Sequence, residues 1–209
     1  EGGSQGFPKP PMVLLVVSGG PGTLKTVHGT LIKKKPCVVL AESGGAAEDI
    51  YNYCKGDGKL PTAGKSSSGR VITQSHVEAC REFLPQIKEL GFADEGANRV
   101  AQLTFFKPSD DPEGRGTDLD YVILKAVLSD LEKTSDAIML AVSWGQPTII
   151  QEQLENSEQA DPKGLANALE AALIKGTDDK TAEKVVQVLI DFKAEAKFVN
   201  FNTLFDSIQ

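Results

Sequence analysis

Two short apolar runs near the start of the chain, MVLLVV (12–17) and PCVVLA (36–41), show no strict alternation of polar and apolar positions. A continuous run of this length is typical of a strand buried on both faces of a sheet. Each run is followed by a stretch whose apolar residues lie three or four positions apart, residues 22–34 and 46–55, and this spacing predicts helices. Strand, helix, strand, helix with short connections predicts a parallel sheet.

The middle of the chain alternates between polar segments and further elements. Residues 56–70 and 107–117 are rich in Gly, Ser, Pro and charged side chains, which predicts loops. Residues 71–90 have helical periodicity with Pro85 as a kink, and residues 98–106 predict one more strand.

From Asp118 onward every apolar segment has helical periodicity, and short turns join the segments. This pattern predicts antiparallel helix pairs similar to ankyrin-like layers. We therefore expect an α/β fold followed by an all-α fold. The boundary is expected near residue 110, with a partial Rossmann-like layer in residues 1–110 and helix pairs in residues 111–209.

Composition narrows the classes of partner. The 209 residues have a formal net charge of -7, which argues against nucleic acid and anionic membranes as partners.

No apolar run approaches the roughly 20 residues that span a bilayer. The chain does not begin with methionine, so we expect a fragment of a longer protein.

Cysteine and histidine are scarce. The three cysteines are widely spaced without a CxxC pair, and there are two histidines. This predicts reduced thiols and neither a metal site nor a disulfide framework. His28 and Cys37 lack an evident orienting acid, so we expect them to pack rather than to catalyse.

The first predicted strand ends in a glycine-rich turn, SGGPGT, which precedes a helix. Gly19, Gly20 and Gly22 lack a Cβ, so an anion can approach the backbone closely. The N–H groups and the dipole of the following helix favour negative charge, and Thr23 can cap the helix or donate to a phosphate. Lys25 adds a positive charge next to the turn.

Two known phosphate-binding motifs do not match this turn. A Walker A loop has glycine before Lys-Thr, where this chain has Leu24 before Lys25 and Thr26. The dinucleotide fingerprint has its third glycine at the position of Lys25.

A second turn of similar composition, ESGGAAEDI, follows the second predicted strand. Glu42, at the end of the second predicted strand, can bond a ribose hydroxyl. Two interpretations stay open from the residues alone. The pair of turns binds a phosphate or nucleotide, or the glycines are the tight corners that strand–helix connections need.

The segments VLLVVSGGPGTLKTV and KKKPCVVLAESGGAAEDI resemble the second half of the SLOG domain of melastatin-type transient receptor potential (TRPM) cation channels. Later segments resemble the helices that follow that domain in these channels, in the same order up to the C-terminus: GTDLDYVILKAVL, DAIMLAVSWGQPTII, NALEAALIKG and VVQVLIDFKAEAKFVNFNTLFD.

The resemblance implies a cytosolic regulatory and assembly domain of a channel, located at the cytoplasmic face of a membrane and attached to it only through the parent protein. It implies other subunits of the same channel as partners, in a homotetramer, and ADP-ribose or a related nucleotide as ligand. The positions that match the family's turns are Gly19, Gly20, Gly22, Thr23, Ser43 and Gly44.

Three positions depart from the family's pattern. The second turn of the family often has glycine where this chain has Glu42 and arginine where it has Gly45, so a bidentate phosphate donor is replaced. SLOG enzymes that cleave nucleotides have a catalytic glutamate where this chain has Thr26, and a hydroxyl lacks a tunable carboxylate pKa. We therefore expect no enzyme activity. The alternatives are a SLOG-type nucleotide-processing enzyme and a protein-interaction module without a ligand.

Overall fold

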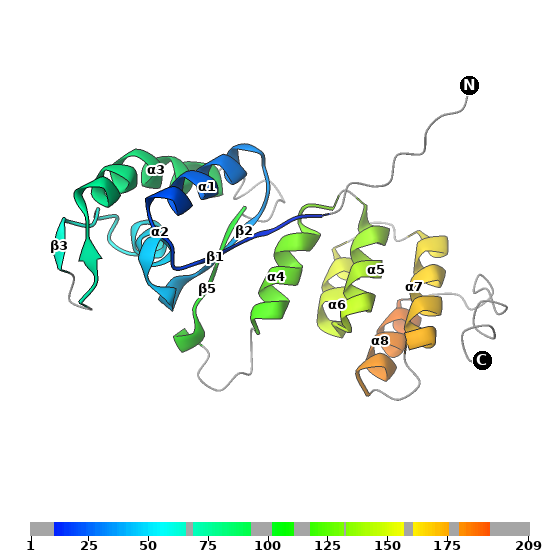
Figure 1. The fold of residues 1–209 in the computed structure, drawn as a ribbon. Coiled ribbons are helices and arrows are strands. Elements are labelled where there is room, and N and C mark those ends of the chain that lie inside the picture. The colour runs from blue at the N-terminus through cyan, green and yellow to red at the C-terminus, as the bar shows by residue number, and fades with distance from the viewer. Residues whose placement is uncertain are drawn as a thin grey trace, which may run out of the picture. The chain divides into compact units, whose positions relative to one another are not determined.

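The computed structural model of the chain describes residues 11–65, 69–92, 102–110, 118–131, 133–156, 161–175 and 180–192. Contacts divide the chain into two compact units, Glu1–Asp130 and Leu131–Gln209. The first unit contains a parallel sheet with helices, and the described elements of the second are all helices (Figure 1). This confirms the expected α/β part followed by an all-α part.

A parallel sheet of three strands, in the order β1-β2-β5, forms the centre of the first unit. Leu14 of β1 pairs with Cys37 of β2, which pairs in turn with Leu103 of β5. All three strands match predicted runs, although residues 98–101 of the expected third run lie outside the described residues. The strands are β1 (Leu14–Val17), β2 (Cys37–Leu40) and β5 (Leu103–Phe106).

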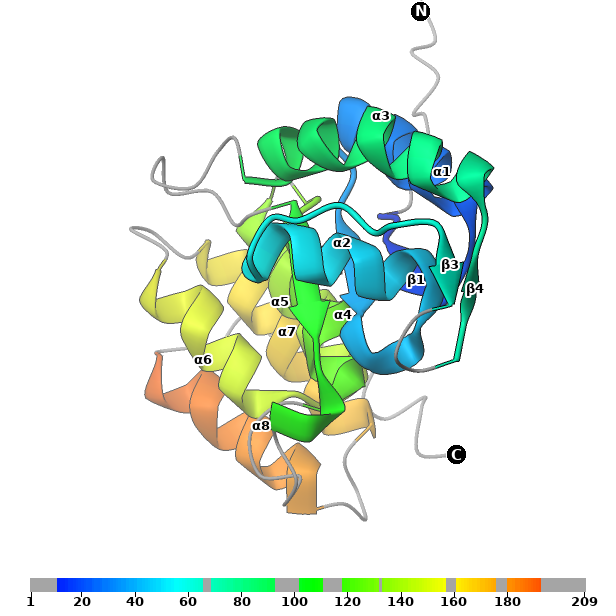
Figure 2. The same ribbon diagram turned by 90° about the vertical axis from the view of Figure 1, so that its left-hand side faces the viewer.

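Helices cover both faces of the sheet because successive side chains of a strand point to opposite sides. Val16 and Val39 belong to the core cluster shared with α1, α2 and α3, whereas Val38 packs with Val122 and Ala126 of α4. Figure 2 shows α1 lying along α3. These helices are α1 (Pro21–Ile32), α2 (Gly45–Lys55), α3 (Gln74–Phe92) and α4 (Leu119–Leu128).

The segment predicted as a loop at 56–70 contains a short strand. β3 (Gly64–Lys65) pairs antiparallel with β4 (Val71–Ile72), so α3 begins at Gln74 rather than at residue 71. Strands of two residues are too short to show a period, which is why the pattern missed them. Two 3₁₀ turns follow strands directly, η1 (Ala41–Ser43) after β2 and η2 (Pro108–Asp110) after β5.

The described part of the second unit consists of four helices, each of which contacts two of the others. α5 packs on α6 and α7, and α8 packs on α6 and α7. Gly145 ends α5 in the left-handed conformation (φ 66°), and Pro147 begins α6, where its missing N–H has no cost. The helices are α5 (Thr134–Trp144), α6 (Pro147–Glu155), α7 (Pro162–Lys175) and α8 (Lys180–Asp191).

Contacts divide the two units after Asp130, and the expected boundary near residue 110 stays a prediction. Contacts group α4 with the sheet, because Val122 and Ala126 bury Val38. The sequence interpretation had grouped this helix with the helical pairs, since an amphipathic helix that covers a sheet has the same period as one that covers another helix.

Candidate functional site

The two glycine turns lie at the carboxyl ends of adjacent parallel strands. The first turn (residues 18–23) connects β1 to α1, and the second turn (residues 42–45) connects β2 to α2. Ligands of open α/β sheets bind at this edge. The sheet therefore brings together the two turns that the sequence singled out.

Backbone hydrogen bonds join the two turns directly. The N–H of Ser18 donates to Ser43 Oγ at 2.7 Å, so the side chain of the second turn holds the backbone of the first. In the other direction, Ala46 N–H donates to Gly19 O at 3.0 Å and Ala47 N–H to Ser18 O at 3.1 Å. The first-turn N–H groups of α2, which would otherwise meet an anion, are thus used within the protein.

Gly45 makes this contact possible. It is buried with a φ of 61°, and a Cβ at this position would lie 2.8 Å from the backbone N of Gly19. Gly19 itself has a φ of 93°. Neither conformation suits a residue with a side chain. A side chain at residue 45, including the arginine that is frequent in the resembled family, does not fit this packing.

The start of α1 is more open. Gly20 is the N-cap residue of α1. Its N–H donates to Thr23 Oγ1 at 3.2 Å, so the threonine hydroxyl is occupied within the capping turn. Pro21 has no N–H, which leaves Gly22 as the first donor of the helix without an acceptor in the preceding turn. A Cβ added at Gly20 or Gly22 would meet no described atom within 4 Å.

The remaining expected site residues lie around this edge. Lys25 is exposed on α1. Thr26 is also exposed, and its hydroxyl donates to Gly22 O at 3.0 Å. Glu42 accepts hydrogen bonds from the N–H and the hydroxyl of Ser109, in η2 after β5. The carboxylate expected on a ribose therefore links two neighbouring strand ends.

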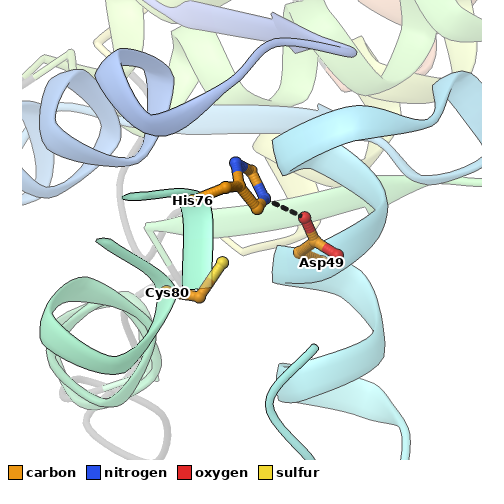
Figure 3. Close-up of side chains that lie close together, drawn as sticks. All are labelled: Asp49, His76 and Cys80. Atoms are coloured by element: carbon orange, nitrogen blue, oxygen red, sulfur yellow. Dashed lines mark hydrogen bonds and ion pairs between the residues drawn. The ribbon is translucent and has the colours of Figure 1, made fainter. Parts of the chain in front are cut away.

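Sequence reasoning missed a buried polar cluster between α2 and α3, formed by Asp49, Arg70, His76 and Cys80. Asp49 Oδ2 lies 2.6 Å from His76 Nε2 (Figure 3). The same oxygen lies 2.8 Å from Arg70 Nη2. Arg70 Nη1 also donates to Gly45 O at 3.0 Å, which connects the cluster to the second turn. The four-residue spacing of His76 and Cys80 on a predicted helix was the available signal.

The chemistry of the cluster is that of an ion pair with a neutral thiol. The pKa of Cys80 is raised to about 12, mainly by burial and also by the charge of Asp49, while Arg70 opposes the rise. The thiol is therefore protonated at neutral pH and is a poor nucleophile. Because His76 Nε2 faces Asp49, it is also not oriented as a base toward the sulfur.

Each unit has a hollow of its own among the described residues. One, of about 430 Å³, is lined by Asp49, Asn52, Asp57, Lys59 and neighbouring residues. The other, of about 530 Å³, lies within the helical unit beside Trp144 and Lys184. Of the helices that the structure describes, none combines the length and the apolar character needed to cross a bilayer.

Comparison with known proteins finds similarity to cation channels. It is 28% identical over 195 residues to Transient receptor potential cation channel subfamily M member-like 2 of Nematostella vectensis, which covers 88% of this chain. It is 26% identical over 212 residues to subfamily M member 2 of Rattus norvegicus and 23% identical over 210 residues to trpm of Drosophila melanogaster. Its curated relatives are TRPM channels.

The TRPM resemblance inferred from the glycine turns and the later helices is thus confirmed. The chain covers 12%, 13% and 10% of the length of these three relatives, so it corresponds to one part of a much larger protein. No family model matches the chain. The finer assignment to a SLOG domain and to ankyrin-like pairs stays a prediction.

Proposed function

We propose that the chain is a regulatory and assembly domain at the cytoplasmic face of a TRPM-like cation channel, and that its partners are other subunits in a homotetramer. The observation on which this rests is that similarity to TRPM channels covers 88–94% of the chain, through both units. The α/β layer, assigned to the SLOG type, is the regulatory part. The ankyrin-like helix pairs are the assembly part.

Exposed apolar side chains of the helical unit support an assembly role. A contiguous apolar patch on a soluble protein marks an interaction site, whereas single exposed apolar side chains are ordinary. Trp144 is 44% exposed at the end of α5, and it lines the hollow beside α8. The other exposed apolar side chains of this unit are Met139, Leu173, Ile174 and Ile190.

Sedimentation equilibrium of the chain tests the assembly part. We expect concentration-dependent self-association that weakens in Trp144→Ser. Ile32→Ser is the matched control, because Ile32 is an exposed apolar residue (58%) of the sheet unit. A monomer at all concentrations, or equal weakening by the control, would contradict the assignment of assembly to the helical unit.

For the regulatory α/β layer, we assign the phosphate of ADP-ribose or a related nucleotide to the first turn. The N–H groups at the start of α2 donate to Gly19 and Ser18, whereas the space in front of Gly20 and Gly22 is open. The positive end of the α1 dipole and exposed Lys25 attract an anion there.

Calorimetric titration of ADP-ribose into the chain tests this assignment, with Gly22→Val and Gly29→Val compared. Both glycines lie in α1 and both have open space around them, so the substitutions perturb the helix similarly. We expect binding to be lost in Gly22→Val and kept in Gly29→Val. No heat from the unmodified chain would leave assembly as the surviving function.

A SLOG-type enzyme is the alternative function. Thr26 stands at the position of the catalytic glutamate, and its hydroxyl is bonded to Gly22 O. We expect no release of base from nucleoside monophosphates by the chain, measured by chromatography. Measurable turnover that Thr26→Ala abolishes would favour the enzyme instead.

A further inference from the structure

Three different metal-ligating side chains converge between α2 and α3. His76 and Cys80 lie four residues apart on α3, which places them on one face of the helix. Asp49 faces them from α2 (Figure 3). One ligand atom of each residue lies within 4.8 Å of those of the other two, and each of the three is at least nine-tenths buried.

A carboxylate oxygen, an imidazole nitrogen and a thiolate sulfur form a ligand set that suits a borderline-soft dication. Zn²⁺ accepts all three atom types in tetrahedral geometry, at roughly 2.0–2.3 Å from each. Tetrahedral ligand atoms at these distances lie roughly 3–4 Å apart. The ligand atoms here lie within 4.8 Å of one another, so the widest separation must close, whereas Asp49 Oδ2 and His76 Nε2, now 2.6 Å apart, must separate slightly to admit the metal. Hard cations such as Mg²⁺ and Ca²⁺ prefer oxygen ligands and do not suit sulfur.

Arg70 provides the positive charge that Asp49 contacts in this structure. Its Nη2 lies 2.8 Å from Asp49 Oδ2 and 2.8 Å from His76 Nε2, so the guanidinium stands beside both ligand atoms. Its Nη1 remains bonded to Gly45 O, and Glu48 Oε2 lies 4.0 Å from it. Arg70 can therefore leave Asp49 while it keeps a backbone acceptor and a second carboxylate.

We propose that Asp49, His76 and Cys80 form a binding site for a transition-metal dication of the Zn²⁺ class, and that Arg70 competes with the metal for Asp49. Of the three ligands, Asp49 alone lines the hollow shared with Asn52 and Asp57, so the entry path is assigned to the side of Asp49. On binding, metal–oxygen, metal–nitrogen and metal–sulfur bonds form, and the proton of the Cys80 thiol passes to solvent. No oxidation or reduction takes place.

The site is also connected to the first glycine turn of the sheet unit. Arg70 bonds Gly45, whose backbone packs on Gly19. A metal that releases Arg70 from Asp49 therefore acts on a residue that bonds the second turn directly and reaches the first turn through Gly45. The metal site itself does not depend on nucleotide binding there.

Titration of the full chain with Co²⁺ under reducing conditions tests the proposal. A thiolate bound to Co²⁺ gives a near-ultraviolet charge-transfer band, and tetrahedral Co²⁺ gives strong visible bands. We expect both, with saturation at one Co²⁺ per chain and displacement by Zn²⁺. The charge-transfer band should disappear in Cys80→Ser and persist in Cys54→Ser, because Cys54 is a buried thiol of α2 outside the cluster.

Arg70→Gln provides an independent test, which applies even if Cys80→Ser does not fold. Removing the Arg70 guanidinium should tighten Co²⁺ binding at least about tenfold, because the guanidinium and a dication bound next to it repel each other by more than about 1.4 kcal/mol. Absence of a charge-transfer band in the folded chain would overturn the site, as would its persistence in folded Cys80→Ser. Unchanged or weaker binding in Arg70→Gln would overturn the competition.

Discussion

The two glycine turns have similar sequences, SGGPG and ESGGA, but their glycines have different physical roles. In the second turn Gly45 is buried against the backbone of Gly19, and the N–H groups that follow it donate to the first turn. In the first turn Gly20 and Gly22 border open space. One turn is closed by packing, while the other presents a helix start to the surroundings.

This difference shows that a glycine-rich turn is not by itself an anion site. Free N–H groups attract a phosphate only if no protein acceptor has taken them. At α2 the carbonyls of Ser18 and Gly19 have done so. Substitutions in the two turns should therefore affect stability in one case and ligand access in the other.

The largest effect is expected from Gly45→Ala. A methyl group there would collide with the backbone of Gly19, and alanine disfavours a φ of 61°. We expect a loss of about 3 kcal/mol or more in the free energy of unfolding, measured by urea denaturation. Gly44→Ala is the control, because its φ is 79° but no described atom lies within 4 Å of its Cβ. An equal loss in both variants would assign the effect to backbone strain alone.

The dependence of stability on alkaline pH should involve the helix after the second turn and not the helix after the first, because α2 carries Cys54 whereas α1 has no cysteine. Burial raises the pKa of Cys54 from 9.0 to about 11, although Lys88 and Lys55 lower it. Above pH 9 the unfolded chain loses this proton before the folded chain does, so stability falls as pH rises toward 11. The slope from one thiol is at most about 1.4 kcal/mol per pH unit.

The unfolding free energy of Cys54→Ala, measured between pH 8 and pH 11, checks this expectation. The variant should decline less steeply than the unmodified chain. Cys37 and Cys80, whose pKa values burial raises to about 12, account for the slope that remains. Identical slopes would show that Cys54 ionises freely in the folded state.

A smaller effect is expected from Ser43→Ala, which removes the side chain joining the turns. Ser43 Oγ accepts from Ser18 N–H and donates to Leu40 O at 2.7 Å. Loss of both bonds should lower the free energy of unfolding by about 1–2 kcal/mol. Hydrogen exchange of the Ser18 amide should accelerate by more than the loss in the free energy of unfolding accounts for. Unaltered protection of that amide would mean that another acceptor replaces the hydroxyl.

The smallest effect is expected from Gly22→Ala. Gly22 lies within α1 with open space at its Cβ, so alanine should fit and change stability by no more than about 0.5 kcal/mol. Gly29→Ala, in the middle of the same helix, should stabilise the chain by about 0.5–1 kcal/mol. Thermal denaturation compares the two. A strong destabilisation by Gly22→Ala would show that the first turn is as closely packed as the second.

Much of the α/β unit was predictable because its strands are continuous apolar runs. The run at 12–17 contains β1 and the run at 36–41 contains β2. The glycine turns could also be placed at one edge, since parallel strands align their carboxyl ends. The packing of Gly45 on Gly19 could not, because it depends on backbone positions in space.

The buried cluster shows the same limit more clearly. Asp49 lies on a different helix from His76 and Cys80, and Arg70 is the last residue of the segment predicted as a loop, 56–70. Only the spacing of His76 and Cys80 was visible in the chain. Glu42 illustrates the opposite case, since its position was predictable but its partner, Ser109, belongs to a segment beyond β5.

The strand order has a consequence for how the chain folds. β2 is the central strand, and it pairs with β1 through Leu14 and Cys37 and with β5 through Cys37 and Leu103. The second closure spans roughly three times as many residues, which costs about 1 kcal/mol more chain entropy. We therefore expect β1, α1 and β2 to form an early folding nucleus. In folding kinetics, substitutions of Val27 and Val39 should then change the folding rate nearly as much as they change stability, which corresponds to high kinetic φ-values. β5 should dock late, so the order of assembly along this sheet follows the order of loop lengths.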